Sequence, residues 1–136
     1  MDRSKDIEMK LELLYNLPFI TIEAAYQGAS INISNILVDT GSASTILAAD
    51  SVKEIGIQPD DNDIPYSIRG VGGAEIVYRR SIDHIKADTF SIENFGIEIG
   101  GMDYGFDING ILGMDFLIQS NAIIDLQQML LNFKFE

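Results

Sequence analysis

The sequence contains no cysteine and no tryptophan, and it has a single histidine, His84. Without cysteine the chain can form no disulfide and offers no thiolate for redox chemistry or metal binding. A metal site would then need imidazole groups or clustered carboxylates, and only one imidazole is present. We therefore expect no metal and no cofactor, and we expect His84 to be a surface or hydrogen-bonded side chain rather than a catalyst.

Positive charge is also scarce, because 9 Lys and Arg residues stand against 21 Asp and Glu residues, a formal net charge of -12. Binding to nucleic acid or to an anionic membrane needs a basic patch, so neither is expected as a partner. A neutral or basic peptide is compatible with this charge. The adjacent Arg79 and Arg80 are expected to be solvated.

Long apolar runs are absent as well, since none approaches the roughly 18 residues that a membrane-spanning helix requires. Residues 1–10 lack the apolar core of a signal peptide, so the expected location is the cytoplasm. The length of 136 residues and a hydrophobic content of 46% are typical of one globular domain. We therefore expect residues 1–136 to form a single domain.

The pattern of apolar residues is mainly that of β-strands. Alternation of apolar and polar residues predicts about eight strands, among them residues 7–13, 20–26 and 76–87. Residues 48–55 and 114–119 have the composition of two short helices. This content favours an all-β protein with a closed or partly orthogonal sheet and one or two short helices.

The first of these predicted helices has recognisable ends. Asp50 and Ser51 are candidate N-caps, because their side-chain oxygens can accept hydrogen bonds from the first turn of a helix. Gly56 is a typical C-terminal stop, because glycine adopts the left-handed backbone conformation that ends a helix.

A short apolar run at residues 36–38 leads directly into Asp39-Thr40-Gly41-Ser42. The run predicts a strand that is buried on both faces. Burying a carboxylate at the end of such a strand is costly unless the carboxylate has a function. We therefore predict that Asp39 is a catalytic acid or base.

Two further glycine-containing motifs follow. Gly70-Val71-Gly72-Gly73 lies between two strand-like runs and predicts a hairpin with a pliable tip. It is no phosphate loop, because no Gly-Lys-Ser/Thr follows it. Ile111-Leu112-Gly113 is a brief apolar strand just before the second predicted helix.

These three motifs, in this order, resemble a retropepsin-like aspartic protease, and most of all the single-domain bacterial members. The resemblance extends over residues 6–135 and includes the run Leu-Gly-Met-Asp-Phe-Leu at residues 112–117. It implies an acid-protease half-barrel that acts as a homodimeric aspartic endopeptidase on a peptide or protein substrate.

The resemblance also implies a role for each motif. Asp39 would be catalytic, Thr40 would hydrogen-bond across the two-fold axis, and Gly41 would let backbone N–H groups approach the carboxylate. Ser42 could hydrogen-bond the outer carboxylate oxygen. The segment Gly70, Val71, Gly72 and Gly73 would be a flap over the substrate, while Ile111, Leu112 and Gly113 would pack beneath the Asp39 turn.

The chain has one Asp-Thr-Gly and no Asp-Ser-Gly, although this chemistry needs two neighbouring carboxylates. The other candidate aspartates, Asp103, Asp107, Asp115 and Asp125, lack that turn context. The second carboxylate would therefore be Asp39 of another copy, which makes the predicted enzyme a symmetric homodimer.

Two other functions fit part of this pattern. One is a catalytically idle dimeric module with the same fold that binds peptides or serves assembly. The other is an unrelated small β-barrel binding protein in which Asp39 merely stabilises a turn. The intact Asp39-Thr40-Gly41 favours the enzyme over both.

Overall fold

The computed structural model describes residues 6–70, 73–102 and 107–134, and strands dominate them. These residues form eleven strands, two short α-helices and one 3-10 turn. The strands are β1 (Ile7–Lys10), β2 (Glu12–Leu14), β3 (Leu17–Tyr26), β4 (Ala29–Val38), β5 (Ile46–Ala48), β6 (Tyr66–Gly70), β7 (Gly73–Ala87), β8 (Phe90–Gly100), β9 (Gly110–Leu112), β10 (Ile123–Asp125) and β11 (Leu130–Phe133). The helical elements are α1 (Ala49–Val52), η2 (Lys53–Ile55) and α2 (Met114–Gln119). No helix in the described ranges is long and apolar enough to cross a membrane.

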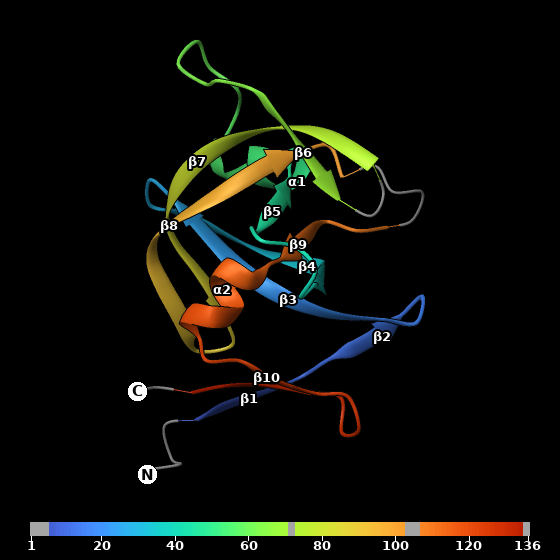
Figure 1. The fold of residues 1–136 in the computed structure, drawn as a ribbon. Coiled ribbons are helices and arrows are strands. Elements are labelled where there is room, and N and C mark those ends of the chain that lie inside the picture. Colours follow the sequence, from blue (N-terminus) through green and yellow to red (C-terminus); the bar gives the residue numbers. More distant parts are fainter. Residues whose placement is uncertain (1–5, 71–72, 103–106, 135–136) are drawn as a thin grey trace.

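The strands form one large sheet and one small sheet. The large sheet has the order β2-β3-β4-β9-β5-β8-β7-β6, and an additional pairing of β3 with β7 closes six of its strands into a barrel. The small sheet has the order β1-β11-β10. Figure 1 shows the small sheet at one end of the molecule. At the opposite end lies the arm, which consists of β6 and the part of β7 that pairs with it, residues 66–70 and 73–77. The fold is thus the all-β structure with short helices that the sequence predicts.

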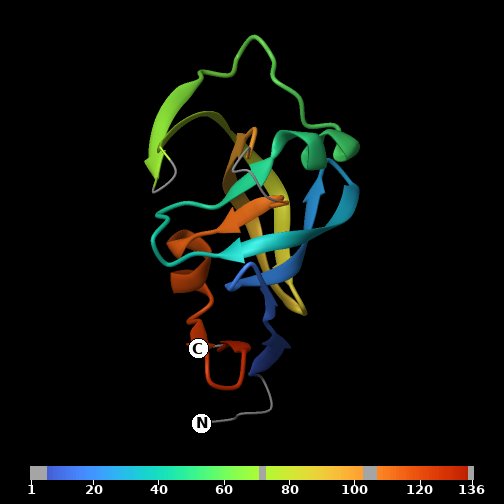
Figure 2. The same cartoon turned by 90° about the vertical axis from the view of Figure 1, so that its right-hand side faces the viewer.

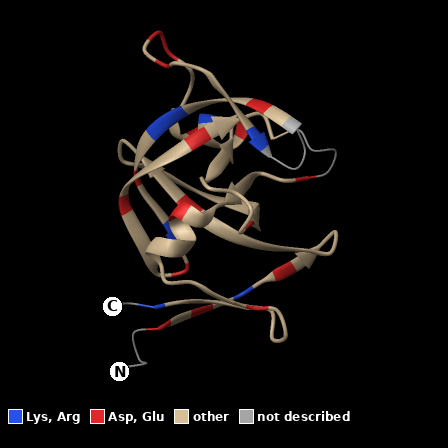
Figure 3. Ribbon diagram, in the orientation of Figure 1, with Lys and Arg blue, Asp and Glu red and all other residues tan. Residues whose placement is uncertain are grey.

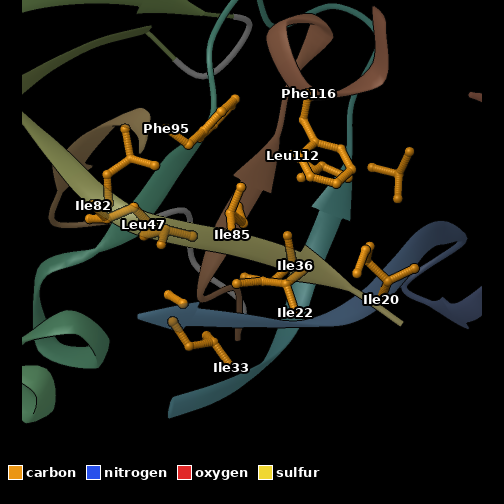
Figure 4. Packing of buried hydrophobic residues seen from close by; sticks show 14 of the residues in the cluster. Ile20, Ile22, Ile33, Ile36, Leu47, Ile82, Ile85, Phe95, Leu112 and Phe116 are labelled. Atoms are coloured by element: carbon orange, nitrogen blue, oxygen red, sulfur yellow. The ribbon is translucent and has the colours of Figure 1, made fainter. Parts of the chain in front are cut away.

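The main core lies inside the barrel. Figure 4 shows side chains from β3, β4, β5, β7, β8, β9 and α2 converging there. Ile36, Leu112 and Phe116 are fully buried in this cluster. These long alternating strands form because each places every second side chain in the core.

A second apolar cluster lies outside the main core, around β5 and β9. Ile68 of the arm and Leu37 of β4 are partly buried and pack against it. The arm therefore contacts the sheet through apolar side chains. The buried members of this second cluster are Phe19, Ile46, Ala48, Met102, Ile108 and Ile111.

The first predicted strand, residues 7–13, is divided between the two sheets. Residues 7–10 pair with β11 in the small sheet, and residues 12–14 pair with β3 in the large sheet. Leu11 lies between them, is buried, and donates its backbone N–H to the Met129 carbonyl at 2.8 Å. An unbroken alternation cannot reveal this crossing, because the side-chain pattern continues through it.

The predicted helix at residues 48–55 begins later than expected. Residues 46–48 are all buried and form β5, which pairs with both β8 and β9. The helix α1 begins at Ala49, its N-cap is Ala48, and no side chain caps it, so the predicted caps Asp50 and Ser51 are wrong. Gly56, with φ of 91°, ends the following 3-10 turn as predicted.

Charged side chains are spread over the molecule, and Figure 3 shows acidic positions in the strands of both sheets. Arg79 is exposed, but the prediction that Arg80 is solvated is wrong, because its side chain is only 15% exposed. The Arg80 guanidinium lies over the rings of Tyr26 and Tyr78, and its Nη2 is 2.8 Å from Asp63 Oδ2. Arg80 therefore attaches the segment after η2 to β7.

Candidate active site

Asp39 follows the last residue of β4 and is partly buried. Its backbone N–H donates to the Leu112 carbonyl at 3.0 Å, which extends the parallel pairing of β4 with β9 by one bond. The start of the Asp39 turn is thus held by the neighbouring strand and not by the turn alone.

The carboxylate of Asp39 is oriented by its own turn. Its Oδ1 accepts the backbone N–H of Gly41 at 2.8 Å, and its carbonyl accepts the N–H of Ser42 at 3.2 Å. A Cβ atom at Gly41 would lie 3.1 Å from that same Oδ1, which is tighter than an ordinary contact. Glycine at this position therefore lets the N–H approach the carboxylate without crowding it. The hydroxyl of Ser42 donates to the Ser44 carbonyl at 2.7 Å, and not to the outer carboxylate oxygen of Asp39 that the resemblance implies as its partner.

The loop after the turn rests directly on the start of α2. The carbonyls of Ser42 and Ala43 accept the N–H groups of Met114 and Asp115, at 2.8 and 3.2 Å. A Cβ atom at Gly113 would lie 2.9 Å from the Ser42 carbonyl oxygen and would clash with the backbone of Ser44. Only glycine fits between the loop and the helix.

A buried polar link also joins this loop to α2. The hydroxyl of Thr45 donates to Asp115 Oδ1 at 2.7 Å, and the Thr45 N–H donates to Asp115 Oδ2 at 3.1 Å. The Gly113 N–H donates to the Thr45 hydroxyl oxygen at 3.1 Å. The sequence motifs assign no role to Thr45 or to Asp115, although an acidic residue in the first turn of a helix is a common stabilising feature.

The segment Ile111-Leu112-Gly113 lies beside the Asp39 turn. Ile111 and Leu112 belong to β9, which runs between β4 and β5. Leu112 is fully buried in the main core, whereas Ile111 points into the second cluster. Because consecutive strand residues point to opposite faces, this short strand contacts both clusters next to the candidate catalytic residue.

The predicted flap is the end of the arm. Gly70 of β6 and Gly73 of β7 are paired, while Val71 and Gly72 lie outside the described residues. Figure 2 shows the arm, the turn after β4 and α2 on the same side of the molecule, in that order from top to bottom. Ile68 packs against the second cluster below it.

Thr40 is exposed and lines an apolar hollow of about 260 Å³ on the same side of the molecule. The rest of the hollow is formed by α2, by the segment that leads into β10 and by β10 itself, and it includes Leu117 and Ile124. Ile118, which also lines it, is 64% exposed. In the small sheet, Ile123 of β10 is also exposed, at 46%. An apolar surface therefore begins one residue from Asp39.

Comparison with known proteins identifies a family and a similar fold. A sequence profile described as aspartyl protease matches residues 22–116, which is well over half of the chain. The fold is similar to that of the crystal structure of a retropepsin-like aspartic protease from Rickettsia conorii, with a TM-score of 0.64 and 16% sequence identity. That match covers 94% of this chain and 92% of the other chain. None of the curated proteins matches the sequence. The chain therefore belongs to the aspartyl protease family and has a retropepsin-like fold.

Proposed function

We propose that the protein is an aspartic endopeptidase whose active site is completed by Asp39 of a second copy. The observation that carries this proposal is the position of Asp39. It stands at the end of a buried strand, its backbone is bonded to Leu112, and its carboxylate is oriented by the Gly41 N–H. Membership of the aspartyl protease family supports the same reaction class.

Two carboxylates brought close together cannot both ionise, because the second charge is repelled by the first. Such a pair holds one proton and titrates as a unit, and aspartic proteases are the standard example. In the proposed reaction, the ionised Asp39 removes a proton from a water molecule that attacks the peptide carbonyl. The protonated Asp39 of the other copy donates a hydrogen bond to the carbonyl oxygen, which stabilises the developing charge.

The apolar surface beside Thr40 supports the proposed homodimer. A two-fold axis close to Asp39 would bring the same surface of both copies together, since such an interface uses one patch twice. Exposed Ile118 and Ile123 would then be buried, which is favourable by about 25 cal/mol for each Å² of apolar area. Thr40 lies at the inner edge of this surface and is the residue proposed to hydrogen-bond across the axis.

The proposed substrate is an extended segment of a peptide or protein. A chain bound beneath the arm could pair its backbone with strand edges, while pockets select its side chains. The tip at Gly70, Val71, Gly72 and Gly73 would close over it and exclude water during the reaction. Ser42 would hold the loop that carries the carboxylate, and Ile111, Leu112 and Gly113 would support it from below.

Replacement of Asp39 tests the proposed function. The Asp39→Asn change nearly preserves volume but removes both the base and the shared proton. Cleavage of a diverse peptide mixture, followed by mass spectrometry, should fall at least about 10³-fold. Asp50→Asn is the matched control, because Asp50 is exposed on α1 and should leave activity unchanged.

The outcomes of this experiment separate the proposal from its rivals. Undiminished cleavage by folded Asp39→Asn protein would exclude Asp39 as the catalyst. Binding of peptides by the wild type without any cleavage would indicate the idle peptide-binding module instead. Circular dichroism of all three proteins shows whether the fold is retained.

A further inference from the structure

Glu98 on β8 is a buried carboxylate that the proposed reaction does not use. The residue is only 4% exposed. Its Oε2 atom is buried and has no hydrogen-bond partner among the described residues. Leaving a buried charged oxygen without a donor is unfavourable, so such groups are usually paired or serve a ligand.

Glu98 lies on the same face of the sheet as the catalytic turn. Paired residues of neighbouring strands point to the same face, and an unbroken row of such pairs crosses the sheet from β4 to β7. Leu37 precedes Asp39 by two residues, so the side chains of both residues point to the same face of the sheet. The row consists of Leu37, Ile111, Ile46, Glu98 and Arg79.

This face is apolar and is the one that the arm covers. Ile46 and Ile111 are buried in the second cluster, against which Ile68 of the arm packs. The carboxylate of Glu98 therefore lies among the apolar residues of this floor, and the carboxylate of Glu75 lies on the same face against Gly100. A substrate held by the arm would pass over the same floor.

Within the described residues, the polar neighbours of Glu98 leave its buried Oε2 without a hydrogen bond. Tyr66 of the arm interacts with the carboxylate: burial raises the pKa of the Tyr66 hydroxyl, and Glu98 raises it further. Arg79 pairs with Glu98 along the backbone, and its guanidinium lies across Gly96 and interacts with the Tyr66 hydroxyl, whose pKa it lowers. The ion pairs found within the described parts of the chain do not include Glu98. A cationic group of a bound ligand would therefore supply the hydrogen-bond donor that Oε2 lacks.

The spacing of the strands places Glu98 within reach of a bound peptide. Three strand spacings separate β8 from β4, which is about 14 Å at about 4.8 Å for each step. An extended peptide advances about 3.3 Å for each residue, so this distance corresponds to about four residues. Because a long basic side chain spans part of this distance itself, the basic residue can lie only about two or three residues from the cleaved bond.

We propose that Glu98 forms a substrate subsite that binds a Lys or Arg side chain two to four residues from the cleaved bond. This inference rests on the proposed function and names the substrate class of that same site. The ammonium or guanidinium group donates to Oε2 and neutralises the buried charge. The formal charge of -12 favours the approach of such cationic peptides.

Paired peptides test the subsite. Each pair carries either lysine or norleucine, which has a similar length but no charge, at one position up to four residues from the cleaved bond. For the wild type, kcat/KM should favour lysine at least about tenfold at one position. In Glu98→Gln this ratio should fall to within about threefold of unity. The control Glu93→Gln removes the same charge from an exposed position on β8 and should keep the wild-type ratio.

The experiment separates failure of the subsite from failure of the protease. Cleavage that depends on Asp39 but shows no lysine preference, or an equal preference in Glu98→Gln, overturns the subsite and leaves the protease intact. If no cleavage depends on Asp39, the same peptides, labelled with a fluorophore, are titrated against Asp39→Asn protein. Equal binding of lysine and norleucine peptides then overturns the subsite. Should Glu98→Gln fail to fold, Glu98→Leu replaces it, and its preference should shift to norleucine.

Discussion

Thr45 and Asp115 lie 70 residues apart in the sequence, and both carboxylate oxygens of Asp115 accept hydrogen bonds from Thr45. Thr45 is fully buried, and its hydroxyl oxygen also accepts the N–H of Gly113. Asp115 Oδ1 accepts a further bond from the N–H of Phe116 within α2. One pair of residues thus connects the loop after Asp39, the end of β9 and the start of α2.

The first prediction concerns the Thr45 hydroxyl. Thr45→Val keeps the shape but leaves the Gly113 N–H and part of the Asp115 carboxylate without a partner. Because the Gly113 N–H is buried and the Asp115 carboxylate is partly buried, the free energy of unfolding should fall by about 1–3 kcal/mol. Urea denaturation measures this change.

Thr45→Ser is the matched control for that change, since it keeps the hydroxyl and removes only a methyl group. It should lose about 1 kcal/mol or less. Equal destabilisation by the two replacements would mean that packing, and not the hydrogen bonds, makes Thr45 important. If the link also positions Asp39, kcat should fall in Thr45→Val and recover in Thr45→Ser.

The features that the sequence predicts correctly are those with local signals. The apolar run before Asp39 indicates a buried strand, because three such residues in succession cannot alternate with solvent. Gly56 ends a helical segment through its own backbone freedom. The helix at residues 114–119 also follows from its neighbours in the chain.

The missed features depend on partners that are far away in the sequence. The strand at residues 46–48 is too short to show a period, and it forms because β8 and β9 pair with it. Asp115 resembles any acidic residue in the first turn of a helix until Thr45 is placed beside it. Glu98 continues an ordinary polar and apolar alternation, yet folding buries it beneath the arm. Such pairings cannot be read from neighbouring residues.

The second prediction concerns the apolar surface beside Thr40. Ile118→Glu places a charge on an exposed residue that should be buried between the two copies, so the dimer dissociation constant should rise at least about tenfold. On dilution, the specific activity of the variant should then begin to fall at a higher protein concentration than that of the wild type. Sedimentation velocity and activity over a dilution series measure both effects.

Ile64→Glu is the control for this change, because Ile64 is 80% exposed in the segment after η2. It introduces the same charge far along the chain from α2 and should leave association unchanged. A wild-type monomer with full specific activity would contradict the requirement for two carboxylates. An unaffected Ile118→Glu dimer would place the interface elsewhere.

The third prediction concerns the end of the arm. β6 is an edge strand that pairs only with β7 among the described residues, so its other edge has no strand beside it there. Gly73→Val restricts the backbone at the proposed flap and should lower kcat at least about tenfold, with the unfolding free energy changed by about 1 kcal/mol or less. Ala74→Val adds bulk at the neighbouring exposed position and should leave kcat within about twofold. Equal kcat values in the two variants would exclude a closing role for Gly73.

The last prediction concerns the pair formed by Glu23 on β3 and His84 on β7. His84 Nε2 lies 2.7 Å from Glu23 Oε2, and this hydrogen bond lowers the pKa of Glu23 below its ordinary value of 4.5, against the opposing effect of burial. A lowered pKa means that the folded protein favours the ionised carboxylate. The pair therefore stabilises the fold fully above about pH 4.5, and this contribution is lost as the pH falls through the folded-state pKa.

Thermal unfolding of Glu23→Gln against the wild type at several pH values measures this contribution. The wild type should have the higher Tm at pH 6–7, by about 1–3 °C, because partly exposed pairs of this kind contribute about 1 kcal/mol or less. The difference should shrink toward zero between about pH 4.5 and pH 3, as Glu23 becomes protonated and its bond with His84 weakens. Glu12→Gln, at an exposed position on β2, should show no such convergence. A difference that stays constant down to pH 3 would mean that the charge of Glu23 does not contribute to stability.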